Sequence, residues 1–205
     1  MNKNNYNKKG FTLIELLVVL GIFVLLISAT TWIFITSLRS TNIIWDQLEA
    51  QSDGRSVIKT IVDEARRAEE SSTGSFPIDT ADDNELIFYA NVDSDSKRER
   101  VHFWLTSTTL KRGIIKPSGS PLAYNLVDEE IKDLANYVVN IGEGIPLFRY
   151  YDEFYSGTST PLMTPASSTQ IQVISVQLKL EKDSSKTPVP LNLESSVQIR
   201  NLKSN

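Results

Sequence analysis

The feature that most constrains this chain is a long apolar run near its N-terminus that contains a single charged residue. The run extends from Phe11 to Leu38, about 28 residues, whereas roughly 20 apolar residues span a bilayer as a helix. Its only charge is Glu15. A carboxylate at bilayer depth costs roughly 2.5–3.5 kcal/mol on insertion scales, so such a residue indicates a function. We therefore expect a membrane-spanning helix in which Glu15 is either protonated or paired with a cation.

The charges that flank the run predict its orientation. Lys3, Lys8 and Lys9 precede it, and no basic residue follows until Arg39. Basic residues favour the cytoplasmic side, so we expect the N-terminus in the cytoplasm and the chain from about Arg39 onward outside. A cleaved secretory signal has an apolar core of only about 7–15 residues, followed by an A-x-A-like site that is missing here. An ordinary uncleaved anchor is the main alternative.

The rest of the sequence predicts an α+β fold in which a long helix packs on an antiparallel sheet. Residues 39–70 contain no proline and carry an apolar stripe, so the helix is expected to continue beyond the membrane. The stripe lapses around Gly54. It then resumes with four residues that should pack on the sheet: Ile58, Ile61, Val62 and Ala65.

Strand patterns follow a helix-breaking segment at residues 71–77. The clearest are near the C-terminus, at 171–181 and 191–201, where apolar and polar residues alternate. Such alternation is typical of an antiparallel sheet that is covered on one face. Further strands are expected at 85–92, 100–106, 109–117 and 145–154, whereas 126–138 fits either a short helix or a strand.

The segment KKGFTLIELLVVLGIF closely resembles the N-terminal signature of type IV pilins and type II secretion pseudopilins. The shared features are a basic leader, a glycine, a phenylalanine and then Thr-Leu-Ile-Glu before an apolar helix, over about 25 residues. The resemblance implies that a prepilin peptidase cuts between Gly10 and Phe11 and that the new terminus, Phe11, is methylated. It also implies that Glu15 pairs with the terminal amine of a neighbouring subunit during assembly. The alternative is a helix-start glutamate that lies in the membrane interface and is favoured by the helix dipole.

The same resemblance implies an organisation for the whole chain. Residues 1–10 would be a cleaved leader, 11–38 the transmembrane and assembly helix, 39–72 its periplasmic or extracellular continuation, and 73–205 the sheet domain. Looser matches in the sheet region, such as LIFYANVD and LKRGIIKP, are similar to J-type minor pseudopilins and related minor pilins. Many pilins have a proline in the membrane helix, and this chain has none there.

The function implied is that of a minor pilin or pseudopilin that primes or caps a filament used in secretion, adhesion or DNA uptake. Its expected partners are other pilins or pseudopilins, the prepilin peptidase, an inner-membrane assembly platform and membrane lipid. It would be a single-pass protein of the inner membrane that moves into the filament or its tip. The alternative function is a membrane-anchored extracellular binding domain that never enters a filament.

A group of basic residues near one predicted hairpin is a weaker candidate for a contact site. Its members are Lys97, Arg98, Arg100, Lys111, Arg112 and Lys116, with Glu99 as the nearby acid. They could contact DNA, wall polymers or an acidic partner, but solvated strand edges explain them more simply. Loss of the leader, with its three lysines, takes the formal charge from −4 to −7, which argues against strong nucleic-acid binding.

Catalysis, a cofactor and a metal are not expected. The chain has no cysteine, and its one histidine, His102, lies in a strand-like segment beside Trp104 without a nucleophile motif. We therefore expect a paired or surface strand histidine. Asp93 and Asp95 resemble an oxygen-ligand loop, but calcium takes about 6–8 oxygens. Since Glu99 is the only further acid nearby, a turn is the favoured interpretation.

Overall fold

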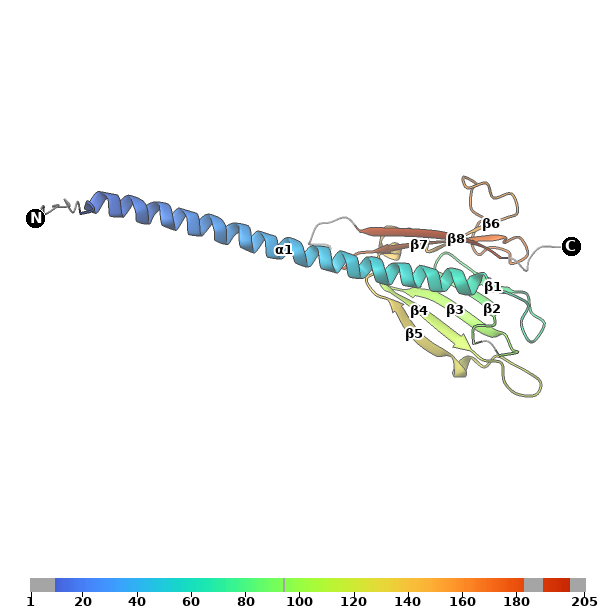
Figure 1. Cartoon of the computed structure of the whole chain (residues 1–205). Coiled ribbons are helices and arrows are strands. Elements are labelled where there is room, and N and C mark those ends of the chain that lie inside the picture. Colours follow the sequence, from blue (N-terminus) through green and yellow to red (C-terminus); the bar gives the residue numbers. More distant parts are fainter. Residues whose placement is uncertain (1–9, 94, 183–189, 200–205) are drawn as a thin grey trace, which may run out of the picture. The chain divides into compact units, whose positions relative to one another are not determined.

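The structure is a computed structural model that describes residues 10–93, 95–182 and 190–199. The chain forms two compact units, Met1–Trp45 and Asp46–Asn205. The helix α1 (Leu13–Ala65) begins in the first unit and ends in the second, and it is followed by antiparallel strands (Figure 1). This order of elements confirms the predicted α+β layout of a long apolar helix followed by antiparallel sheet structure.

In the first unit, α1 contains a stretch that is long and apolar enough to cross a membrane. This stretch is Leu13–Leu38, 26 residues, and none of it is buried. Three of its hydroxyl side chains donate to backbone carbonyls of the preceding turn: Ser28 to Val24 at 2.8 Å, Thr30 to Leu26 at 2.9 Å and Thr36 to Trp32 at 2.9 Å. Because the helix itself accepts these hydrogen bonds, the hydroxyl groups do not require water.

The second unit contains two antiparallel sheets rather than the single sheet that was expected. The first has five strands in sequence order: β1 (Ile78–Ala81), β2 (Glu85–Ala90), β3 (Glu99–Thr106), β4 (Thr109–Ile115) and β5 (Glu130–Ala135). The second has three strands, also in sequence order: β6 (Phe148–Tyr151), β7 (Val173–Leu180) and β8 (Leu191–Gln198). The strand β1 was not anticipated from the sequence.

The chain passes from one sheet to the other after β5. Tyr137 adopts a φ of 63°, and Val138 then forms an isolated bridge with Leu180 of β7. A short helix, α2 (Asn140–Glu143), leads to β6. The segment 126–138, which fitted either a helix or a strand, contains the 3-10 turn η1 (Leu126–Asp128) and then β5.

The last part of α1 packs on both sheets, and in Figure 1 it runs between them. The four residues predicted to face the sheet are all buried: Ile58, Ile61, Val62 and Ala65. Gly54 explains the lapse in the apolar stripe. A Cβ atom at this position would lie 2.5 Å from Leu193 Cδ1 and 2.8 Å from Leu180 Cδ1, so the missing side chain lets α1 approach β7 and β8 closely.

The helix ends at Ala65, before the predicted end of its outer segment at residue 72. The next turn tightens, because the amide of Ala68 donates to the carbonyl of Ala65 at 3.1 Å. The chain then pairs with β2: Ala68 bridges Ala90, and the amide of Glu69 donates to Tyr89 at 2.9 Å. Pairing with the sheet therefore replaces the helical hydrogen bonds.

A buried ion pair joins α1 to β4. Arg112 donates to Glu64 twice, from Nη2 to Oε1 at 2.6 Å and from Nε to Oε2 at 2.9 Å. The two side chains are only 18% and 9% exposed. Burial raises the pKa of Glu64, and the hydrogen bonds from Arg112 oppose that effect. This fork-shaped contact fixes the position of the helix along the five-stranded sheet.

We expect Arg112→Met to lower the free energy of unfolding by about 3–5 kcal/mol, because it leaves the Glu64 carboxylate buried without its partner. Urea unfolding of the full chain in detergent micelles, followed by near-ultraviolet circular dichroism, measures this loss. The double variant Glu64→Leu/Arg112→Met should recover most of it. Arg66→Met is the matched control, since the pair of Arg66 with Asp63 is about half exposed. Equal losses in Arg112→Met and Arg66→Met would contradict the assignment.

Candidate processing and assembly site

The start of α1 is capped by two side chains, those of Thr12 and Glu15, each of which accepts a hydrogen bond from the backbone amide of the other residue. The backbone amide of Thr12 donates to Glu15 Oε2 at 2.9 Å, and the Thr12 hydroxyl donates to the same oxygen at 3.0 Å. In return, the backbone amide of Glu15 donates to Thr12 Oγ1 at 3.3 Å. This arrangement is a capping box, with Thr12 as the N-cap and Glu15 at the third helical position.

The capping box gives Glu15 a local role at the start of the helix. The sequence reasoning weighed a helix-start glutamate favoured by the helix dipole, but it did not anticipate the hydrogen bonds with Thr12. The first amides of a helix have no carbonyl partner within the helix, and the positive end of the helix dipole lies there. The Glu15 carboxylate accepts a hydrogen bond from the amide of Thr12, and its negative charge is favourable beside the positive end of the helix dipole. The signal was present in the sequence as Thr-x-x-Glu directly before an apolar run. Both bonds from Thr12 fall on Oε2, so Oε1 takes no part in the box.

The peptide bond between Gly10 and Phe11 lies in an exposed segment before the helix. Both residues are non-helical, and the Phe11 side chain is 87% exposed. A Cβ atom added at Gly10 would meet nothing within 4 Å. A peptidase needs accessible backbone that is not held in a helix, and this segment provides it. The small size of Gly10 is therefore not required by packing within the described chain.

A cut between Gly10 and Phe11 would leave the capping box complete. Both members of the box, Thr12 and Glu15, lie on the C-terminal side of that bond. The cut would create an α-amine at Phe11, close in sequence to the carboxylate. The arrangement can thus supply both halves of an ion pair, an ammonium and a carboxylate, at the same end of every subunit.

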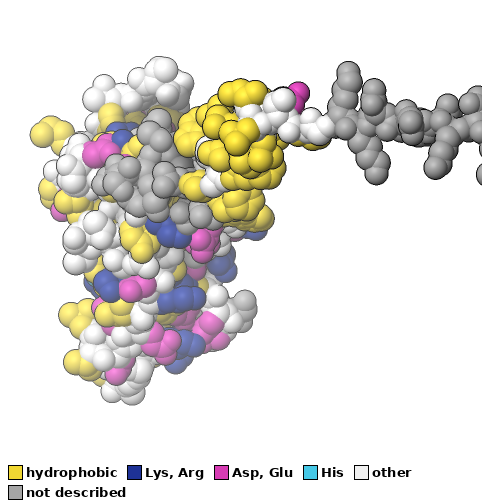
Figure 2. All heavy atoms as spheres, turned by 90° about the vertical axis from the view of Figure 1, so that its left-hand side faces the viewer, with side chains coloured by type: hydrophobic (Ala, Val, Ile, Leu, Met, Phe, Trp, Pro, Cys, Tyr) yellow, Lys and Arg dark blue, Asp and Glu magenta, His cyan; other side chains and the backbone are white. Residues whose placement is uncertain are grey.

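Most of the basic residues predicted as a contact patch have carboxylate partners in the second unit. The pairs are Arg98–Glu69 at 3.2 Å, Arg100–Asp79 at 3.6 Å, Lys111–Asp133 at 2.6 Å, Arg112–Glu64 at 2.6 Å and the close contact Lys116–Asp93. Lys97 Nζ donates to the carbonyl of Pro117 at 3.4 Å. Figure 2 shows basic and acidic side chains interspersed over the sheets. An anionic partner would have to compete with these carboxylates.

His102 lies between two glutamates on the five-stranded sheet. Its Nε2 is 2.9 Å from Glu85 Oε1, and its Nδ1 is 2.9 Å from Glu129 Oε1. Its ring stacks on Trp104, with centroids 4.0 Å apart. The strand partner of His102 is Gly113, and the Glu129 side chain fills the space above that glycine. These contacts place His102 in a structural polar cluster, as expected for a paired strand histidine.

Residues 5–31 match the family model for the prokaryotic N-terminal methylation motif, and this segment includes Gly10, Phe11 and Glu15. No curated protein matches the chain. The motif supports a precursor of the type IV pilin or pseudopilin kind and indicates a structural protein rather than an enzyme. It also implies interaction with other pilins and with a prepilin peptidase, and it is consistent with a single-pass anchor in the inner membrane.

Proposed function

We propose that this chain is the precursor of a minor pilin or pseudopilin. It is cut between Gly10 and Phe11, methylated at Phe11, and joins a filament through the segment 11–38, whose helix begins at Leu13. The observation that carries this proposal is the combination of the methylation motif with an apolar helix that is exposed over its whole length. Such a helix needs lipid before assembly and can pack against other helices after it.

Glu15 favours a filament subunit over a simple anchor. In an isolated anchor its charge lies near the start of a segment that contains no other charge. In a filament, the α-amine at Phe11 of a neighbouring subunit can pair with Oε1, while Oε2 keeps the capping box. Pairing two charges in an apolar surrounding adds little net stability, but it specifies alignment. The pair would therefore fix the axial register between subunits.

The second unit then acts as the exposed part of the subunit. With the basic leader in the cytoplasm, the chain after the membrane helix lies on the outer side of the inner membrane. The two sheets on the end of α1 give it a surface that can contact neighbouring subunits. In this proposal the subunit primes or caps the filament and does not build its shaft.

The cut is tested directly in cells that carry the native peptidase. Intact-mass measurement of the wild-type chain should show a mature protein that begins with methylated Phe11, because the Gly10–Phe11 bond is exposed and non-helical. Gly10→Lys should leave the precursor uncut. Gly21→Ala is the matched glycine control, since a Cβ there also meets nothing within 4 Å, and it should be cut normally. A wild-type chain that still begins at Met1 would overturn the proposal.

The assembly role of Glu15 can be separated from its capping role. Glu15→Gln removes the charge but keeps an oxygen that accepts from the Thr12 amide, as glutamine does in capping boxes. Thr12→Ala removes the capping hydroxyl but keeps the charge. We expect Glu15→Gln and Glu15→Ala to be inserted and cut, yet to be at least about tenfold depleted from filaments, while Thr12→Ala still enters them.

The measurement is the amount of mature chain in the sheared filament fraction relative to the membrane fraction. Mass spectrometry of each fraction confirms that the variants are cut equally, so that a processing defect is not mistaken for an assembly defect. If Glu15→Gln enters filaments at the wild-type level while Glu15→Ala does not, the carboxylate acts only as a helix cap and the pairing role is wrong.

A further inference from the structure

Three carboxylates converge at the turn between β2 and β3. They belong to Asp93, Asp95 and Glu99, and one oxygen from each lies within 4.8 Å of the others. Calcium binds oxygens at about 2.3–2.6 Å, so two oxygens on the same ion can be up to about 5 Å apart. The observed spacing therefore allows all three carboxylates to bind one ion without a change in the path of the backbone.

Glu99 supplies a second and independent indication of a ligand. The residue is 0% exposed, although it carries a carboxylate. Its Oε2 accepts from the backbone amide of Val92 at 3.0 Å, whereas its Oε1 is buried and has no hydrogen-bond partner among the described residues. Buried polar atoms without partners are rare in native proteins and call for a specific explanation. A cation at the cluster would be the missing partner.

The charges around the cluster leave a surplus of negative charge. Lys116 Nζ contacts Asp93 Oδ2. Among the ion pairs of the described residues, this one joins a lysine to one of the three carboxylates. The backbone amide of Lys97 donates to Asp95 Oδ1 at 2.6 Å. Burial raises the pKa of Glu99, and the charges of Asp93 and Asp95 raise it further. The hydrogen bond from Lys116 instead lowers the pKa of Asp93, so the ammonium acts on one of the three carboxylates.

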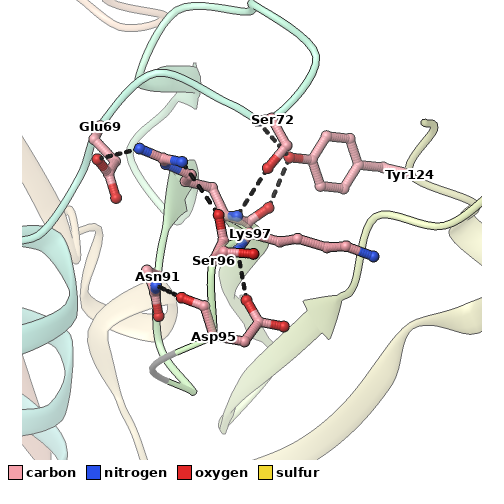
Figure 3. Close-up of polar contacts among 8 residues, drawn as sticks. Glu69, Ser72, Asn91, Asp95, Ser96, Lys97 and Tyr124 are labelled. Carbon is pink, nitrogen blue, oxygen red and sulfur yellow. Dashed lines mark hydrogen bonds and ion pairs between the residues drawn. The ribbon is translucent and has the colours of Figure 1, made fainter. Parts of the chain in front are cut away.

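Arg98, which follows the turn, is held by three residues that Figure 3 labels: Glu69, Ser72 and Tyr124. Its amide donates to Ser72 Oγ at 2.8 Å, its Nη2 contacts Glu69 Oε2 at 3.2 Å, and its carbonyl accepts from the Tyr124 hydroxyl at 2.7 Å. Asn91 Nδ2 also donates to the carbonyl of Asp95. Because these contacts hold both ends of the turn, the carboxylates are held near one another before any ion arrives.

We propose that Asp93, Asp95 and Glu99 bind one calcium ion, with water completing its shell and with Lys116 competing for Asp93. Carboxylate oxygens suit hard divalent cations. Calcium tolerates irregular, partly hydrated shells, whereas magnesium demands a near-ideal octahedron at about 2.0–2.1 Å. This inference does not depend on the proposed role in a filament, because it concerns only the turn.

The test is isothermal titration calorimetry with calcium chloride on the metal-stripped full chain in detergent micelles. We expect one ion per chain with a Kd of about 0.1–1 mM, the range of extracellular modules. Asp95→Asn and Glu99→Gln should each weaken binding at least about tenfold, since each removes a charged ligand. Lys116→Gln should instead tighten binding about threefold or more, because it removes the competing ammonium.

Glu130→Gln is the matched control, since Glu130 is an exposed carboxylate on β5, and it should bind calcium as the wild type does. Asp95 is exposed at the turn, so Asp95→Asn tests the site even if Glu99→Gln fails to fold. The proposal is overturned if neither the wild type nor Lys116→Gln shows saturable binding up to about 10 mM, tenfold above the expected range. It is also overturned if Asp95→Asn binds as tightly as the wild type, or if magnesium binds more tightly than calcium.

Discussion

The exposed apolar surface of Leu13–Leu38 is the constraint on which the rest of the molecule depends. Burying one large aliphatic or aromatic side chain is worth about 1.5–3 kcal/mol, so this helix cannot remain in water. Lipid can cover it, but lipid tails are as apolar as leucine and give no preference for one helix arrangement over another. Directional contacts must then come from the few polar groups at the start of the helix. Thr12 and Glu15 are those groups, and they are already joined to each other.

In the second unit, by contrast, one side of the same helix is buried by the protein itself. From Gly54 to Ala65 its buried positions recur at helical spacing and face two sheets. The close approach at Gly54 and the ion pair between Glu64 and Arg112 act at different points along this stretch. The first fixes the distance of α1 from β7 and β8, and the second fixes its position along β4. One continuous helix is thus apolar all round in one unit and apolar on one side in the other.

The features that were predicted correctly depend on the periodicity of neighbouring residues in the sequence. Those that were not predicted depend on contacts between residues far apart in the sequence. The spacing of Ile58, Ile61 and Val62 was enough to predict their burial. The alternation along β7 predicted its buried apolar face, but Ser175 on the face expected to be wet is buried as well. The division into two sheets and the contact of Arg112 with a residue 48 positions away require knowledge of strand register. Gly54 looked like a break in the stripe because its partners lie far along the chain. The capping box is the exception, because Thr-x-x-Glu is a local pattern; a helix-start role for Glu15 was weighed, but its hydrogen bonds with Thr12 were not predicted.

Three glutamates among the described residues differ in how far the chain itself supplies partners for their carboxylates. Glu64 and Glu99 are buried, whereas Glu15 is exposed on α1. Glu64 is matched inside the fold, because Arg112 satisfies both of its oxygens. Glu15 is matched in part, because Thr12 occupies Oε2 while Oε1 stays outside the capping box. Glu99 likewise has one oxygen bonded and the other buried without a partner. In each of our two proposals another molecule would supply the partner that the chain does not: a neighbouring amine at Glu15 and a cation at Glu99.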